Sequence, residues 1–336
     1  MSLKDSIKQL QKREHITQDE IIRRLGCTRS SLMENPSAEA IAAFDYAFGS
    51  TPIHDSGNAV KIRKDSRESK ELEKLLPWAR KFPIRALQNK GLIPANIKDA
   101  DLVRAVFRFM NVGSTAGFEN YYSATLQATN PQTNAAWIRL GELSIERSTT
   151  EYTPDSEAIL SNLKFLRTNV YLHGQDLRKV AREALNNCGI KLIEVEPFLT
   201  APTPASAFYW RGNQPVIQVP TSRMDDAKFL EAIFHAVGHL LYHPLRTMCL
   251  QTGTAKCDPA TAPHPFEIKA DAFAQDTLLS EAEECELICC GRFNERRCIQ
   301  HFSGLFHVRP GILVARLQQQ GKIKRGSPLN DFKIAV

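Results

Sequence analysis

Apolar positions along the chain recur mostly with helical spacing, and strand-like runs are confined to its middle. The pattern predicts short helices within residues 3–50, one beginning at the capping sequence Thr17-Gln18-Asp19-Glu20 and two more over 29–34 and 38–48. Later helices are expected over 157–166, 174–187, 230–241, 266–274, 298–305 and 310–319, and strands over 190–195, 207–211 and 215–219. The chain is therefore expected to be an α+β protein, mostly α, with a small β-sheet.

Shifts in composition predict four segments. A helical N-terminal domain spans residues 1–50, a charged segment spans 51–74, a helical middle region spans 75–150, and a larger domain spans 151–336. In 51–74 the charges alternate in sign, which favours a solvated linker or an exposed helix over a basic arm on DNA. The middle region carries no recognisable chemistry, and we expect it to serve as a spacer, a dimer contact or a docking surface.

Composition narrows the class of protein. The hydrophobic content of 43% is ample for a packed core, and no apolar run approaches the roughly 18 residues that a membrane span needs. The N-terminus lacks a basic and then apolar signal, so we expect a cytoplasmic protein without membrane contact. The net charge of +6 permits contact with nucleic acid or an acidic partner without requiring either.

Two histidines carry the main chemical signal. His235 and His239 are four residues apart in a predicted apolar helix, so both imidazoles project from one face and can reach one ion. The metallopeptidase form of this motif, H-E-x-x-H, has a glutamate as general base directly after the first histidine. Here that position is Ala236.

A third ligand is predicted on the next helix. Glu267 and Asp271 are four apart in the otherwise apolar segment 266–274, so they share a face. Two histidines and one carboxylate form the zinc-ligand set of thermolysin-like catalytic sites. We therefore predict zinc on His235, His239 and Glu267, with Asp271 accepting a hydrogen bond from a ligand histidine. His243 is a rival ligand, but its position two turns beyond His235 favours a helix-end or substrate-side role.

The larger domain resembles the ImmA/IrrE family of zinc metallopeptidases. The resemblance rests on F-L-E-A-I-F-H-A-V-G-H-L-L-Y-H at 229–243 and E-I-K-A-D-A-F-A-Q-D-T-L-L at 267–279, and it extends over about the C-terminal half. It implies a zincin-like fold over 151–336 and a partner that is a DNA-binding repressor or antitoxin, cleaved to control a stress, mobile-element or defence operon. It also implies that His235, His239 and Glu267 are the zinc ligands and that Asp271 contacts a ligand histidine.

Ala236 departs from that family pattern. An alanine has no proton acceptor, so the chain as written is expected to bind zinc but to cleave poorly or not at all. Two explanations stay open. We favour a glutamate that was changed to alanine in an otherwise intact protease; the other is a natural, non-catalytic transcription regulator or antitoxin that uses the zinc fold as a scaffold.

The N-terminal helices resemble the helix-turn-helix of Xre-type repressors, through T-Q-D-E-I-I-R-R-L-G-C-T-R-S-S-L at 17–32. The resemblance implies that Arg29, Ser30 and Ser31 open a recognition helix and face operator DNA. The alternative is a small helical bundle for protein contacts, and a homodimer is compatible with either.

Two other groups of residues have candidate roles. Tyr209 and Trp210 could line a substrate groove beside the metal helix, although packing in the sheet explains them equally well. Cys285, Cys289, Cys290 and Cys298, with His301 nearby, suggest a second metal site or a redox switch. They lack the C-x-x-C spacing of a structural zinc site, and apolar packing is an equally good reading. In a signal-less chain with eight cysteines we expect reduced thiols rather than a disulfide framework.

Overall fold

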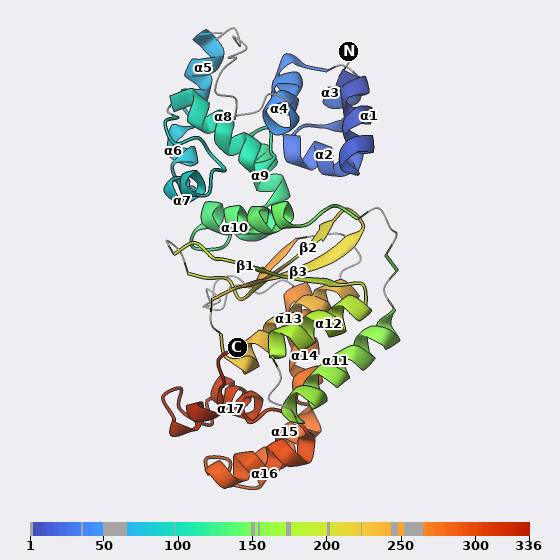
Figure 1. Cartoon of the computed structure of the whole chain (residues 1–336), viewed down its shortest axis with the longest axis vertical. Helices are drawn as coiled ribbons and strands as arrows, with labels where there is room; N and C mark the ends of the chain where they lie inside the picture. The colour runs from blue at the N-terminus through green and yellow to red at the C-terminus, as the bar shows by residue number, and fades with distance from the viewer. Residues whose placement is uncertain are drawn as a thin grey trace. The chain divides into compact units, whose positions relative to one another are not determined.

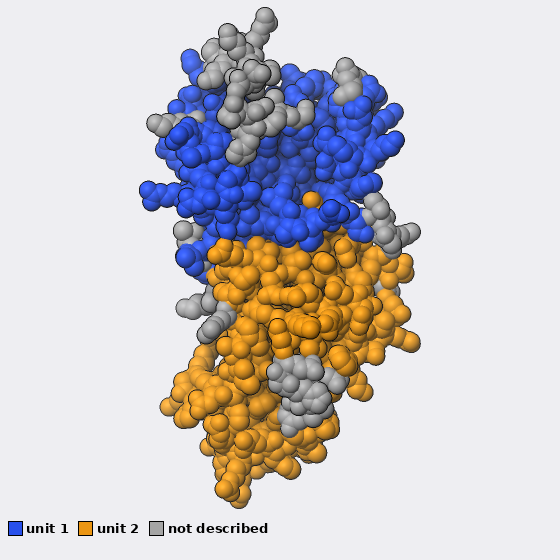
Figure 2. Space-filling view, viewed as in Figure 1, with its two compact units in different colours: residues 1–149, 198–202 blue, residues 150–197, 203–336 orange. Residues whose placement is uncertain are grey.

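The computed structural model describes residues 3–34, 36–49, 66–97, 99–148, 152–153, 155–172, 176–199, 202–222, 224–242, 248–251 and 265–336. The chain divides into two compact units, coloured separately in Figure 2. Unit 1 comprises Met1–Thr149 and Phe198–Pro202, and unit 2 comprises Thr150–Pro197 and Thr203–Val336. Among the described helices, none combines the length and the apolar character that crossing a bilayer requires.

The regular elements of unit 1 that the structure describes are helices and one 3₁₀ turn. Its elements are α1 (Leu3–Glu14), α2 (Gln18–Leu25), α3 (Arg29–Met33), α4 (Ala38–Phe48), α5 (Ser66–Glu73), α6 (Leu76–Ala79), α7 (Ile84–Asn89), α8 (Asp99–Met110), α9 (Thr115–Tyr121), the 3₁₀ turn η1 (Ser123–Thr125) and α10 (Pro131–Ser144). Helices α1 to α4 enclose a small apolar core of their own. Residues 51–65 of the predicted charged linker lie outside the described residues, and most of the remainder forms α5.

Local capping explains where the N-terminal helices begin and end. The Thr17 hydroxyl accepts a hydrogen bond from the backbone N–H of Glu20 at the start of α2, and Thr28 caps α3 in the same way. Gly26 ends α2 in the left-handed conformation, with φ of 70°. A Cβ on Gly26 would also lie 2.4 Å from the backbone nitrogen of Gly117, so glycine is needed there for packing as well. The predicted helices of this segment are confirmed.

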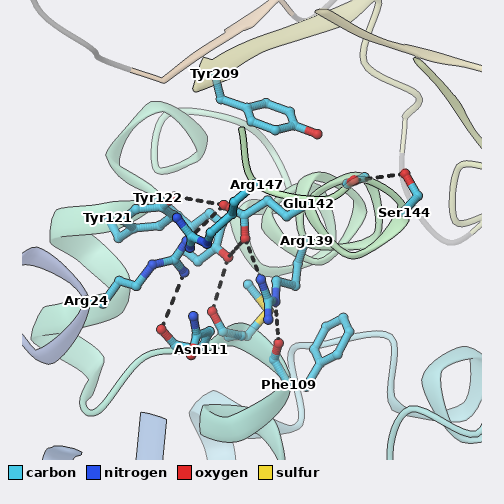
Figure 3. A network of polar contacts seen from close by, with 12 residues as sticks. Arg24, Phe109, Asn111, Tyr121, Tyr122, Arg139, Glu142, Ser144, Arg147 and Tyr209 are labelled. Atoms are coloured by element: carbon cyan, nitrogen blue, oxygen red, sulfur yellow. Dashed lines mark hydrogen bonds and ion pairs between the residues drawn. The ribbon is translucent and has the colours of Figure 1, made fainter. Parts of the chain in front are cut away.

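A buried network of charges links α2 to α10 (Figure 3). The carboxylate of Glu142 accepts from Arg24 at 3.0 Å and from Arg139 at 2.7 Å, and both Arg24 and Glu142 are completely buried. The hydroxyl of Tyr121 donates to the same carboxylate at 2.7 Å, and the Arg24 guanidinium stacks 3.6 Å from the centre of the Tyr121 ring. Because buried charges are tolerated only when they are paired, this network fixes α2 against α10.

Unit 2 combines helices with a small mixed sheet. Its elements are α11 (Ser156–Leu172), α12 (Leu177–Asn187), β1 (Lys191–Val195), β2 (Ser206–Arg211), β3 (Gln214–Pro220), α13 (Asp226–Tyr242), β4 (Cys249–Gln251), α14 (Pro265–Leu278), α15 (Glu281–Cys289), α16 (Arg296–Phe306), α17 (Pro310–Gln319) and the 3₁₀ turn η2 (Pro328–Phe332). The strand order is β1-β3-β2-β4, with β1 parallel to β3 and the other neighbours antiparallel. The expectation of a mostly helical α+β chain with a small sheet is confirmed.

Helices α11 to α14 lie on one face of this sheet (Figure 1). The core between them contains Phe208 and Ile217 from the sheet and Phe229, Ile233 and Val237 from α13. In the register, Phe208 pairs with Ile217, so both side chains emerge on the helix-covered face. This packing places the helix that carries His235 and His239 directly under the central strands.

Candidate metal centre

Helix α13 is held at its beginning by a buried aspartate. The Asp226 carboxylate accepts from its neighbour Ala227 at 3.0 Å and from the backbone N–H of Ile334 at 3.2 Å, and it pairs with Arg309 at 3.2 Å. Apolar side chains surround the rest of the helix, so its axis and rotation are set by the core. Within this setting His235 and His239 are 3% and 1% exposed.

Helix α14 packs closely along α13 because small residues meet at the contact. A Cβ on Gly238 would lie 2.9 Å from the Cα of Ala270. Gly238 lies between the two histidines of α13, and Ala270 lies between Glu267 and Asp271 of α14. The close approach therefore brings the two carboxylates against the two imidazoles.

Three potential ligand atoms converge there. The Nε2 atoms of His235 and His239 are 2.9 Å apart. The Glu267 carboxylate lies 3.3 Å from Nε2 of His235 and 3.5 Å from Nε2 of His239. Among the described residues, His235, His239 and Glu267 form a group whose ligand atoms lie close enough together to hold one metal ion.

The spacing fits a small divalent ion. A tetrahedral ion with bonds of about 2.0–2.2 Å separates its ligand atoms by about 3.3–3.6 Å. Oε2 of Glu267 lies 3.3 Å from Nε2 of His235 and Oε1 lies 3.5 Å from Nε2 of His239, so each carboxylate oxygen is at such a separation from one histidine. The two histidine nitrogens, at 2.9 Å, are slightly closer than that range. Glu267 is 38% exposed, so the group lies at the edge of the core and has an open side. Three protein ligands and an open side correspond to a site that can also take a water or a substrate atom.

The electrostatics of the group also favour a cation. Burial alone would lower the pKa of His235, but the carboxylates of Asp271 and Glu267 raise it to about 9. Burial opposes ionisation of Glu267, yet the two histidines hold its pKa well below its usual range. Without an ion, a proton on His235 supplies the positive charge that the carboxylates attract, and a metal ion would replace that proton.

Asp271 stands behind His235. Its Oδ1 atom lies 2.7 Å from the Nδ1 atom of His235, the distance of a close ion pair. This buried Nδ1 makes no regular hydrogen bond with the described residues, so the contact is an ion pair in place of the predicted hydrogen bond. A carboxylate in this place holds the imidazole with Nε2 free to face the other two ligands. The structure thus brings His235, His239, Glu267 and Asp271 together, as the spacing of the residues predicted.

The chain gives no significant match to any protein-family model, curated protein or solved structure.

One acidic residue beside the group was not predicted from the sequence. Glu231 lies on α13 one turn before His235, and its carboxylate accepts a hydrogen bond of 2.7 Å from the side-chain amide of Gln319 on α17. Burial raises the pKa of Glu231, the Gln319 hydrogen bond offsets part of that rise, and the nearby Asp271 adds to it. The sequence contained an indication of this position, because Glu231, His235 and His239 follow one another at intervals of four residues and therefore share a helix face.

The other residues singled out near the motif lie in different settings. Ala236 is 1% exposed and belongs to the apolar core of unit 2. His243 lies outside the described residues. Tyr209 is 1% exposed, and its hydroxyl donates to Gln218 at 2.8 Å, so it takes part in the packing of the sheet. Trp210 packs edge-on against Tyr152 and Phe208.

The predicted DNA-facing residues lie at the beginning of α3. Arg29 and Ser30 are exposed, and their side chains bond locally to Gln18 and Glu34. Ser31 completes a capping box with Thr28, so its hydroxyl is engaged in starting the helix. A role of these residues in binding operator DNA stays a prediction.

Proposed function

We propose that unit 2 is a zinc-binding domain of the metallopeptidase type, with a zincin-like fold. The observation that carries the proposal is the convergence of Nε2 of His235, Nε2 of His239 and the Glu267 carboxylate at 2.9–3.5 Å, with Asp271 behind His235. Two imidazoles and one carboxylate are the ligand set of catalytic zinc sites. The resemblance of 229–279 to the ImmA/IrrE family supports the same reading.

Each side chain would have a separate role at such a site. His235, His239 and Glu267 would hold the ion, and Asp271 would orient His235. A zinc ion at this place acidifies a bound water and polarises a carbonyl group. The residue that normally removes the proton from that water is Ala236 here, so this chain lacks the general base.

In its complete form, the hypothesis is that this protein is a cytoplasmic zinc endopeptidase that acts as a regulator. Its substrate would be a DNA-binding repressor or antitoxin, whose cleavage switches on a stress, mobile-element or defence operon. The helices of unit 1 would select that partner or its operator. In this reading the alanine at position 236 inactivates a protease whose remaining site residues are in place.

A second function is favoured by the surroundings of Ala236. Its side chain is part of the apolar core of unit 2, which suits an alanine and requires no glutamate. On that reading the chain is a transcription regulator or antitoxin that uses the zinc fold as a scaffold without cleaving anything.

One substitution separates the two functions. We expect Ala236→Glu with zinc to cleave the repressor or antitoxin encoded beside the gene about 10²–10⁴ times faster than the chain as written. Ala236→Gln is the matched control, because it has the same size but accepts no proton. Adding His239→Ala to Ala236→Glu is expected to abolish the gain by removing a ligand. If Ala236→Glu binds zinc, stays folded and cuts no more than Ala236→Gln, the scaffold function stands instead.

A further inference from the structure

Two cysteines meet where α15 ends and α16 begins. Cys290 directly follows α15, and Cys298 lies in the first turn of α16. Their sulfur atoms are 3.2 Å apart, Cys290 is exposed and Cys298 is half-buried, and both are free thiols. A disulfide requires its sulfurs at about 2.05 Å, so a movement of about 1 Å would close this pair.

The connection between the two cysteines can absorb that movement. Gly291 adopts a left-handed conformation with φ of 69°, and a Cβ there would meet nothing within 4 Å. The loop that follows belongs to no helix or strand until α16 begins at Arg296. Each sulfur is therefore carried by a different element, joined by an exposed turn.

A second pair on the same segment provides a contrast. Cys285 and Cys289 are both exposed, and their sulfurs are 3.8 Å apart. They are four residues apart within α15, which fixes their Cβ atoms at about 5–6 Å. A disulfide needs Cβ atoms about 3.5–4.5 Å apart, so this pair cannot close while the helix is intact.

The surroundings give the two closing sulfurs different roles. Cys290 is the more exposed of the two thiols, so peroxide reaches it first. Its sulfur accepts from the backbone N–H of Arg292 at 3.4 Å and donates to the carbonyl oxygen of Leu287 at 2.9 Å. Burial and the neighbouring Cys290 sulfur raise the pKa of the Cys298 thiol to about 12, so Cys298 keeps its proton. Between the two cysteines lie Arg292, Arg296 and Arg297 with a single acidic residue, Glu295, so the connecting segment carries a net positive charge.

We propose that Cys290 and Cys298 form a reversible disulfide site that reacts with hydrogen peroxide. The Cys290 thiolate attacks one peroxide oxygen, the O–O bond breaks, and the departing hydroxide takes up a proton and leaves as water. Cys298 then attacks the Cys290 sulfenic acid: the S–S bond forms, the S–O bond breaks, and the hydroxide leaves as a second water with the Cys298 proton. Two thiols are oxidised to one disulfide while one peroxide is reduced to two waters.

The pairing can be read by peptide mapping of the full chain after peroxide treatment. Trypsin cleaves after Arg292, Arg296 and Arg297, so the proposed disulfide joins two separate peptides, whereas a Cys285–Cys289 bond would lie within one. We expect a loss of about 2 Da in chain mass, a cross-link between Cys290 and Cys298, and reversal by dithiothreitol. The double variant Cys285→Ser/Cys289→Ser is the matched control and should keep the cross-link.

Single substitutions test the two roles. In Cys298→Ser, a dimedone adduct is expected at Cys290, because the sulfenic acid has no partner. In Cys290→Ser, peroxide should consume the Cys298 thiol about tenfold more slowly than it consumes Cys290 in Cys298→Ser. A cross-link through Cys285 or Cys289, or irreversible oxidation of Cys290 beside an intact Cys298, would overturn the proposal. None of these readouts depends on zinc or on peptidase activity.

Discussion

Gly238 and Ala270 make the contact that sets the distance between the two helices of the candidate metal centre. A Cβ on Gly238 would approach the Cα of Ala270 to 2.9 Å, closer than real Cβ contacts allow. The histidines flank this contact on α13, and the two acidic residues flank it on α14. The separation of the ligand atoms is therefore a consequence of helix packing as well as of ligand spacing along each helix.

Gly238→Ala should consequently weaken metal binding. Alanine favours an isolated helix by about 1 kcal/mol over glycine, but the added methyl must push α14 away. Metal–ligand distances tolerate shifts of only about 0.2 Å, so we expect the zinc dissociation constant to rise about tenfold or more. Competition with a chromophoric chelator measures it. Gly326→Ala is the matched control, since a Cβ there meets nothing within 4 Å; equal affinities in the two variants would contradict the argument.

Asp271→Asn tests the residue behind His235. The substitution keeps the size of the side chain but removes the charge that lies 2.7 Å from Nδ1 of His235. Losing such a partner of a ligand histidine typically costs 10–100-fold in metal affinity, and we expect a loss of about that size. Asp276→Asn, on the exposed side of the same helix, should leave the affinity unchanged. A loss shared by both variants would mean that the general charge of α14 matters rather than the contact with His235.

The metal-free chain should lose stability in alkaline solution. The pKa of His235 is raised to about 9 in the folded chain, above the value of about 6.5 of an unfolded histidine. A raised pKa contributes stability that is complete below about pH 6.5 and is lost as the pH rises through about 9. We expect unit 2 to lose up to about 3 kcal/mol between these values, measured as a shift in the urea midpoint in the presence of a chelator.

Bound zinc should reverse that pH dependence. The ion needs an unprotonated His235, so between about pH 6.5 and 9 its apparent affinity is expected to rise by up to tenfold per pH unit. His301→Ala, which removes an exposed histidine of α16, should show both trends unchanged. A metal-free midpoint that stays level from pH 6.5 to 9.5 would show that His235 does not carry the proton.

The candidate metal-binding group could be predicted from the sequence because each pair of its residues lies within one helix. Two histidines four apart must share a helix face, and so must Glu267 and Asp271. The spacing of residues could not show the contact between Gly238 and Ala270, because it depends on how two residues 32 positions apart in the chain pack together. Strand β4 was missed for a related reason: three residues are too few for an alternating pattern, and the strand exists because β2 offers an edge to pair with.

The buried charges of unit 1 were also beyond the sequence pattern. Arg24 follows Ile21 and Ile22 on an amphipathic helix, where arginine usually lies on the solvated face. In the fold it is completely buried, because Glu142, more than 100 residues later, reaches it at 3.0 Å. Only the tertiary structure reveals that α2 carries a charge in its packed face.

Glu142→Gln should therefore destabilise unit 1 strongly. The substitution keeps the shape but removes the carboxylate that Arg24 and Arg139 share. Arg24 retains its ion pair with Glu20 at 2.9 Å, so we expect a loss near the lower end of the roughly 3–5 kcal/mol that breaking a buried ion pair costs. Glu71→Gln is the matched control, because Glu71 pairs with Lys74 at the surface, where both side chains are about 70% exposed and an ion pair contributes at most about 1 kcal/mol. Hydrogen exchange of α2 and α10 measures the difference. Equal protection in both variants would mean that apolar packing alone holds these helices together.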